Sequence, residues 1–114
     1  MSARFTTRQV GDVTVIDAVG RITLGEGSAL LRDTVKSLVA AGNKKLLMNL
    51  GDVSYIDSSG VGELVYSFTT VTSQQGQFKL LNLSKRVEDL LQITKLYTVF
   101  EVHDDETRAV RSFS

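Results

Sequence analysis

The sequence predicts an α/β domain: a mixed sheet of four or five strands with an amino-terminal hairpin and about four helices packed mainly on one or both faces. Apolar runs typical of strands alternate with segments whose apolar residues recur at helical spacing. Connections through helices imply parallel neighbouring strands with right-handed crossovers. The chain of 114 residues has no proline and no linker-like stretch, so we expect one domain spanning residues 1–114.

The amino-terminal part of the chain predicts a hairpin and then a helix. Residues 5–10 alternate in polarity, residues 11–12 suit a two-residue turn, and residues 13–19 suit the second strand. Ser28 is expected to cap the following helix, and Gly42 is expected to end it. The apolar positions of this helix are Leu31, Val35, Leu38 and Val39.

The middle of the chain predicts a buried strand, a loop and a second helix. Residues 46–50 are a nearly continuous apolar run, as in a strand covered on both faces. Residues 51–57 suit a loop, after which a helix begins near Ser58 and ends at residues 74–76. Its expected buried stripe consists of Val61, Leu64, Val65, Phe68 and Val71.

The carboxyl-terminal part predicts two more strand and helix pairs. Residues 78–83 suit a strand, and Ser84 suits the cap of a third helix. Residues 97–102 suit the last strand, and Asp104 or Asp105 suits the cap of a short final helix. The apolar positions of these helices are Val87, Leu90 and Leu91 in the third and Ala109, Val110 and Phe113 in the last.

Composition excludes several classes of function. The 13 Lys and Arg residues balance the 13 Asp and Glu residues, which disfavours a nucleic-acid-binding protein. No apolar run approaches the roughly 20 residues of a membrane span, and the first residues lead into polar threonines instead of an apolar signal core. Without cysteine, disulfides and Cys-based metal sites are excluded. We therefore expect a cytoplasmic protein without a membrane span.

The sequence offers few groups for catalysis or cofactor binding. His103 is the only histidine and is expected to be a surface or capping residue, since a metal site or triad needs several partners. Gly20, Gly25 and Gly27 match neither the Walker spacing nor the dinucleotide fingerprint. We therefore predict no enzyme and no catalytic, cofactor-binding or metal-binding residues.

One polar segment lies where a strand and loop lead into a helix. Asp57, Ser58 and Ser59 suit a helix start, because short polar side chains accept hydrogen bonds from free backbone N–H groups. Gly60 and Gly62 lack a Cβ atom, so another backbone or a partner can approach closely. A well-capped helix accounts for most of these residue types, and the residues alone do not establish a functional site.

Residues 50–62, LGDVSYIDSSGVG, resemble the signature of STAS domains, in particular that of bacterial anti-sigma factor antagonists. The resemblance extends along the chain to the amino-terminal hairpin, the Gly20-Arg21-Ile22 turn, the strand ending in Asn49-Leu50 and the strand exit at residues 81–84. It implies a STAS-like sheet with helices packed on one side.

The resemblance also implies a function in partner switching. A serine-kinase anti-sigma factor would be bound when Ser58, the first serine after the motif aspartate, is unmodified, which frees a sigma factor for transcription. The kinase would phosphorylate Ser58, and a PP2C-type phosphatase would act on the phosphorylated form. The expected partner-binding residues are Arg21, Thr23, Asp57, Ser59, Gly60, Gly62 and Glu63.

The sequence departs from the family pattern in one turn and leaves two alternatives. Residues 20–24 read GRITL, where many antagonists carry acidic residues, which bears on the identity of the partner. One alternative is a non-switching STAS binding or scaffold module of a sensory or lipid-transport complex. The other is a small enzyme with Ser58 as nucleophile, for which the sequence shows no recognisable base or oxyanion element.

Overall fold

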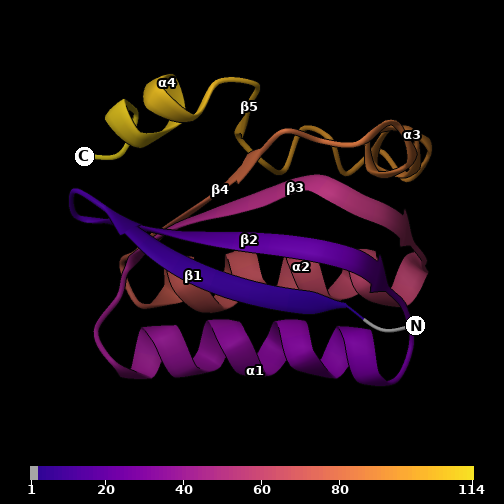
Figure 1. Ribbon diagram of the computed structural model, residues 1–114, viewed down its shortest axis with the longest axis horizontal. Coiled ribbons are helices and arrows are strands. Elements are labelled where there is room, and N and C mark those ends of the chain that lie inside the picture. The colour runs from indigo at the N-terminus through magenta and orange to yellow at the C-terminus, as the bar shows by residue number, and fades with distance from the viewer. Residues whose placement is uncertain (1–2) are drawn as a thin grey trace.

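The computed structural model describes residues 3–114, which form a five-stranded sheet and four helices (Figure 1). The strands lie in the order β1-β2-β3-β4-β5, with β1 antiparallel to β2 and all other neighbours parallel. The predicted fold class is confirmed. The elements are β1 (Arg4–Val10), β2 (Val13–Ile22), α1 (Glu26–Ala40), β3 (Lys45–Ile56), α2 (Ser58–Ser73), β4 (Gln77–Leu81), α3 (Lys85–Ile93), β5 (Val102–His103) and α4 (Glu106–Arg111).

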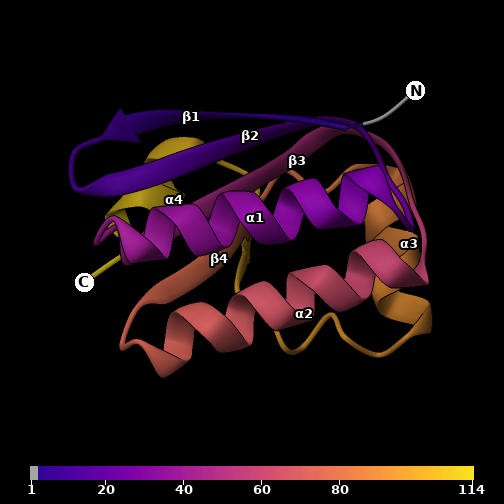
Figure 2. The same cartoon turned by 90° about the horizontal axis from the view of Figure 1, so that it is seen from below.

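The helices lie on both faces of the sheet, so the packing on one side that the resemblance implied is wrong. Helices α1 and α2 run side by side beneath one face, while α4 lies across the other (Figures 1 and 2). Successive side chains of β3 point to opposite faces of the sheet. Leu46 and Met48 enter the large core between the sheet and helices α1 and α2, and Leu47 enters a smaller core with Ala109 of α4. Helix α3 packs against β3 and adds Leu91 to the large core.

Strand β3 is longer than the sequence predicted. Residues 51–56, expected to be a loop, continue the strand and pair with the end of β2. Their glycine and polar residues fit because the pairing contains irregularities between Asp17 and Val19 and between Gly20 and Arg21. Such bulges tolerate residues that a regular strand disfavours.

Strand β5 is shorter than predicted. Only Val102 and His103 pair with β4, so the expected strand over residues 97–102 is wrong. The preceding residues form turns that insert Phe100 into the core. Its ring packs edge-on against those of Phe68 and Phe78, with ring centroids 5.7 and 6.5 Å apart. An apolar run here fills the core instead of extending the sheet.

Several predicted ends of elements are confirmed. Residues 11–12 form the hairpin turn, and Gly42, with φ of 94°, follows the end of α1. The Ser84 hydroxyl accepts from the backbone N–H of Val87, and the Asp105 carboxylate accepts from that of Arg108. These side chains satisfy donors that the first turn of a helix leaves free.

Polar side chains fasten the carboxyl-terminal segment to the sheet. Arg8 of β1 forms a two-pronged ion pair with Glu106 at 2.6 and 2.9 Å, and also pairs with Asp17. The Nζ atom of Lys79, a side chain that is almost fully buried, donates to the carbonyl and hydroxyl oxygens of Ser112 at 2.9 Å each. The hydrogen bonds from Arg8 lower the pKa of Glu106.

The start of α2 approaches the end of β2 more closely than a side chain would allow. Gly60 is buried, and a Cβ atom there would overlap the carbonyl oxygen of Ile22 and lie 2.6 Å from Cγ1 of Ile56. Gly62, two residues later, has open space around its Cα atom. The first of these glycines fixes the height of the helix over the sheet, and the second does not.

The two glycines should respond oppositely to alanine. Gly60→Ala forces the helix away from Ile22 and is expected to lower the free energy of unfolding by about 1–3 kcal/mol. Gly62→Ala restricts only the unfolded chain and is expected to raise it by about 0.4–1 kcal/mol. Urea unfolding of both variants measures this, and equal effects would contradict the close approach.

The Arg8–Glu106 pair should contribute stability that depends on pH. A carboxyl group with a lowered pKa in the folded state stabilises it above the unfolded pKa, which is about 4.3 for Glu. That contribution is lost as the pH falls through the folded value. Glu106→Gln is therefore expected to be less stable than wild type at pH 7, by about 1 kcal/mol or less because the pair is partly exposed. The difference in the free energy of unfolding should vanish in strong acid. Urea unfolding of both proteins between pH 7 and strong acid measures it, and a difference that persists in acid would contradict the prediction.

Candidate functional site

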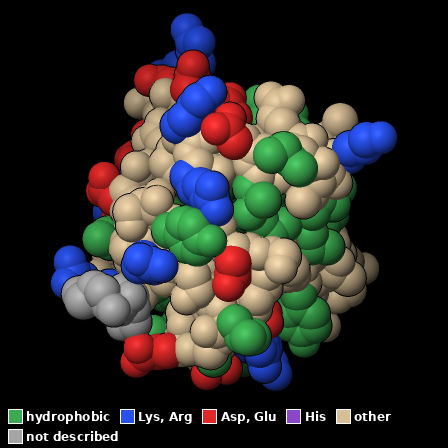
Figure 3. All heavy atoms as spheres, turned by 90° about the vertical axis from the view of Figure 1, so that its right-hand side faces the viewer, with side chains coloured by type: hydrophobic (Ala, Val, Ile, Leu, Met, Phe, Trp, Pro, Cys, Tyr) green, Lys and Arg blue, Asp and Glu red, His purple; other side chains and the backbone are tan. Residues whose placement is uncertain are grey.

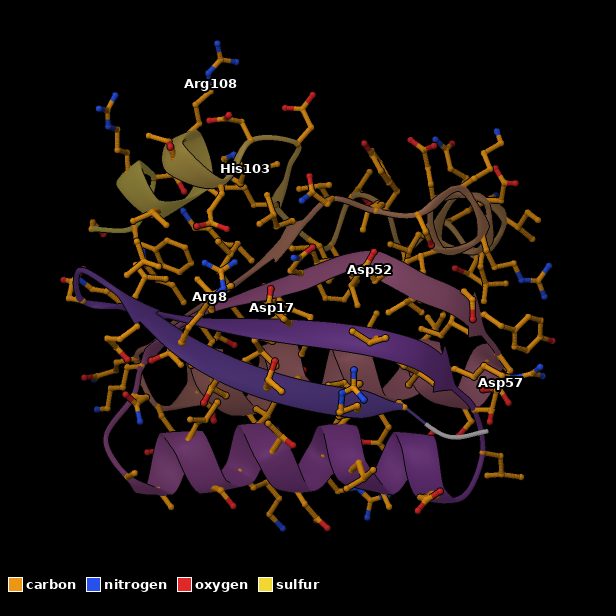
Figure 4. All side chains as sticks on the ribbon, in the orientation of Figure 1. Arg8, Asp17, Asp52, Asp57, His103 and Arg108 are labelled. Atoms are coloured by element: carbon orange, nitrogen blue, oxygen red, sulfur yellow. The ribbon has the colours of Figure 1, made fainter. Side chains whose placement is uncertain are left out.

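The candidate site lies at the carboxyl ends of β2 and β3, where α2 begins. The loop that follows β2 and leads into α1 reaches the same end of the sheet, at the right of Figure 1. Figure 4 labels Asp57 at this end. Parallel strands with helical crossovers bring such loops together at one edge, so segments far apart in the sequence become neighbours here.

Asp57 joins the two loops of the site. One carboxylate oxygen, Oδ1, accepts from the backbone N–H of Gly60 at 2.9 Å and caps α2, while Oδ2 accepts from the N–H of Leu24 at 3.0 Å. The backbone N–H of Asp57 donates to the carbonyl oxygen of Ile22 at 3.3 Å. Desolvation acts to raise the pKa of Asp57, but backbone N–H donors, those of Gly60 and Leu24 foremost, outweigh it and lower the pKa. The hydrogen bonds that join the two loops therefore stabilise the charged form of Asp57.

The two neighbouring serines differ in their surroundings. The Ser59 hydroxyl lies 3.0 Å from that of Ser28, which itself donates to the carbonyl oxygen of Thr23. Ser58 is exposed, and within residues 3–114 its hydroxyl has no hydrogen-bond partner. Of the two hydroxyl groups, only that of Ser58 is both accessible and unengaged.

Ser28 is not the cap that the sequence predicted. Helix α1 begins at Glu26 with Gly25 as its N-cap, at φ of 99° and without a side-chain hydrogen bond. Ser28 lies inside the first turn and is buried. Its hydroxyl therefore links α1 to α2 through Ser59 instead of closing its own helix.

The other predicted partner-binding residues divide into exposed and internal positions. Gly62 is exposed and open, and Thr23 is half-buried with its carbonyl oxygen engaged by Ser28. Gly60 is buried against Ile22, which places it inside the fold and not on the surface where a contact was expected.

Two charged positions flank the site. Glu63 pairs with Arg32 of α1 at 2.9 Å, an ion pair that bridges the two helices. Arg21 is exposed, and its guanidinium carbon lies 5.0 Å from the centroid of the Tyr55 ring. Glu63 therefore lies on α2 against α1, and Arg21 lies at the end of β2.

Leu24, in the loop after β2, is not among the partner-binding residues that the sequence singled out. Its side chain is 80% exposed, although its backbone N–H is bound by Asp57. This side chain, on a loop whose backbone is held by a hydrogen bond, is accessible to a partner. The available signal was a leucine directly before Gly25 in a glycine-rich turn.

The structure separates His103 from Ser58. Figure 4 shows His103 near α4, far from Asp57 at the start of α2, and its Nε2 atom lies 2.6 Å from a carboxylate oxygen of Glu101. A recess of about 480 Å³ includes His103 but no serine. It is lined by Gly51, Asn82, Leu83, Glu88, Tyr97, Val102, His103 and Asp104. Within residues 3–114, the recess that contains the histidine is therefore lined by no serine that could act as a nucleophile beside it.

No helix within residues 3–114 combines the length and the hydropathy needed to cross a bilayer.

Comparison with known proteins places this geometry in a family. The anti-sigma-B factor antagonist of Bacillus subtilis is 40% identical over 73 residues, which are 64% of this chain and 66% of that protein. A crystal structure of an anti-sigma factor antagonist from Mycobacterium paratuberculosis superposes with a TM-score of 0.83 at 16% identity, covering 97% of this chain and 93% of that one. The Bacillus cell fate determinant SpoIIAA, in its phosphorylated form, gives a TM-score of 0.74 at 22% identity over 95% and 97% of the two chains.

The family assignment rests on nearly the whole chain. The model of the STAS domain matches residues 4–109, from the start of β1 to within α4. The sequence resemblance, the fold and the relatives named as anti-sigma factor antagonists agree with that match. The chain therefore belongs to the STAS domain family.

Proposed function

We propose that the protein is an anti-sigma factor antagonist whose binding to a serine-kinase anti-sigma factor is controlled by phosphorylation of Ser58. The unmodified form binds the anti-sigma factor and thereby frees a sigma factor. The kinase phosphorylates Ser58, and a PP2C-type phosphatase removes the phosphate. The observation that carries this proposal is the exposed, unengaged hydroxyl of Ser58 beside a Ser59 hydroxyl held by Ser28.

The names of the relatives support the proposal. The Bacillus subtilis relative is an antagonist of an anti-sigma factor, and structures of SpoIIAA exist for both the unphosphorylated and the phosphorylated form. A non-switching scaffold would share the fold, so the incorporation of phosphate at Ser58 is what separates the two functions.

The folded protein should tolerate phosphate at this position. The modification adds roughly −1.5 to −2 charges, and the start of α2 offsets part of the cost by about 0.3–2 kcal/mol through the helix dipole. Because Ser58 is exposed, solvent also screens the new charge from Asp57. The phosphate therefore changes the surface without unfolding the domain.

A bound partner should not tolerate it. An interface that covers Ser58 would bury the phosphate next to the ionised Asp57, and an unmatched buried charge costs several kcal/mol. Since about 1.4 kcal/mol is a tenfold change in affinity, the complex dissociates while the fold persists.

The Ser58 series tests the switch. Ser58→Ala should fold and bind as tightly as wild type, because the Asp57 cap remains in place. Ser58→Asp should bind more weakly, and phosphoserine more weakly still, because phosphate carries nearly two charges and three acceptor oxygens. Titration calorimetry against the anti-sigma factor, isolated by its binding to the unmodified protein, gives the order of the four affinities.

Controls at Ser59 sharpen this test. Ser59→Ala should still accept one phosphate per chain from the kinase, whereas Ser58→Ala should accept none, as mass spectrometry of the intact proteins would show. Phosphate found only on Ser59 would refute the assignment of the acceptor. Equal affinity across the Ser58 series would remove the switch and leave the scaffold.

Leu24 should contribute to partner binding without contributing to stability. Leu24→Ala removes a side chain that is 80% exposed, so the free energy of unfolding should change by about 0.5 kcal/mol or less. Affinity for the partner should fall roughly tenfold, as for a residue that an interface covers. Ile93→Ala, at a 77% exposed position at the end of α3, is the matched control and should bind as wild type.

A further inference from the structure

Two arginines share one tyrosine ring at the edge of the site. Arg21 at the end of β2 and Arg86 in the first turn of α3 place their guanidinium carbons 5.0 and 4.4 Å from the ring centroid of Tyr55. We call these three residues the arginine–tyrosine cluster. Both arginines are exposed, and Tyr55 is half-buried. Figure 3 shows this end of the molecule, with Lys and Arg side chains close to a hydrophobic one near its middle.

The two positive charges of the cluster lack counter-charges. Among residues 3–114 neither Arg21 nor Arg86 forms an ion pair, whereas Lys85, beside Arg86, pairs with Asp89 at 3.3 Å and Arg32 pairs with Glu63. Two like charges held on one ring repel each other, and an anion between or above them would relieve that repulsion. The two guanidinium groups are therefore available to bind an anion.

The ring also orders the arginines before anything binds. A guanidinium stacked on an aromatic ring keeps its planar set of N–H donors available at the edge. Carboxylates accept two parallel hydrogen bonds from such an edge. Side chains that are ordered in the unbound protein lose less conformational freedom on binding, and Tyr and Arg are the residues enriched at the centres of interfaces.

The cluster is continuous with the switch. Arg21 pairs with Tyr55 in the sheet, and the next pair, Ile22 with Ile56, leads directly to Asp57 and Ser58. A partner that covers Ser58 and Leu24 is therefore expected to reach the cluster as well. The balanced charge of the whole chain disfavours a nucleic acid as the occupant.

Resting on the proposed function, we propose that the cluster binds carboxylate side chains on the anti-sigma factor and so determines which anti-sigma factor is recognised. Asp or Glu side chains of the partner would meet the edges of Arg21 and Arg86 while the adjoining surface covers Ser58. Phosphorylation then controls when the partner binds, and the cluster controls which partner binds.

Affinity measurements with charge-neutral variants test this division. The partner used is the protein that the unmodified full chain captures and the Ser58-phosphorylated chain does not. Arg21→Gln and Arg86→Gln should each weaken its binding roughly tenfold or more, as expected for a lost charged hydrogen bond. Both should also reduce the dependence of affinity on salt. Lys85→Gln, the same charge change one residue away, should alter affinity by about twofold or less because that pair is exposed.

Crosslinking tests the chemistry of the contact directly. Arg86→Lys places an amine where the guanidinium lies, and a carbodiimide joins an amine to a neighbouring carboxylate as an amide. Mass spectrometry should then find position 86 bonded to an Asp or Glu of the partner, and the bond should be absent when Ser58 is phosphorylated.

The outcomes separate this inference from the proposed function. If phosphorylation abolishes binding but both Gln variants bind as wild type, the switch stands and the inference is overturned. Equal losses for Lys85→Gln and Arg86→Gln would also overturn it, since they would indicate general surface charge. If no phosphorylation-sensitive partner is captured, the proposed function fails and the inference fails with it.

Discussion

The contact between the start of α2 and the carbonyl group of Ile22 is the constraint on which the site depends. Gly60 lets the helix come this close, and the N–H of Asp57 donates to the same carbonyl oxygen. With the helix held there, the Asp57 carboxylate reaches both the first turn of α2 and the backbone of Leu24. One close approach thus fixes the loop and the helix start together, and a shift of the helix would disturb both.

In this arrangement, most polar side-chain groups at the start of α2 form hydrogen bonds within the fold, and one hydroxyl group does not. The Asp57 oxygens and the Ser59 hydroxyl are engaged by backbone N–H groups and by Ser28. Such internal bonds rigidify a surface, because each has a fixed geometry. The remaining hydroxyl, that of Ser58, is carried on a rigid base, so a chemical change there alters what the surface presents while its supports stay in place.

Much of the fold could be predicted because local signals agreed with the tertiary structure. The hairpin turn, the caps at Ser84 and Asp105 and the helix start after Asp57 follow from side chains that satisfy nearby backbone groups. The candidate acceptor, Ser58, came from a family resemblance, and the hydrogen bonds of Asp57 and Ser59 then gave that position a physical context.

The misses share a cause, which is that the deciding partner lies far away in the sequence. Residues 51–56 form a strand because β2 pairs with them through bulges, and Ser28, which lies inside the first turn of α1, meets Ser59 of α2. The ring of Tyr55 meets Arg86 only because α3 begins beside the end of β3. No local pattern of residue types encodes such meetings.

The bond between Lys79 and Ser112 has a consequence for how the protein is made. The side chain of Lys79 is almost fully buried, and its ammonium group contacts Glu101, 22 residues further along the chain, and Ser112, 33 residues further along. A buried ammonium without acceptors strongly opposes folding. During synthesis, the partners of Lys79 are therefore complete only once the residues around Ser112 have left the ribosome. The domain is therefore expected to complete its packing only after the segment around Ser112 has been translated.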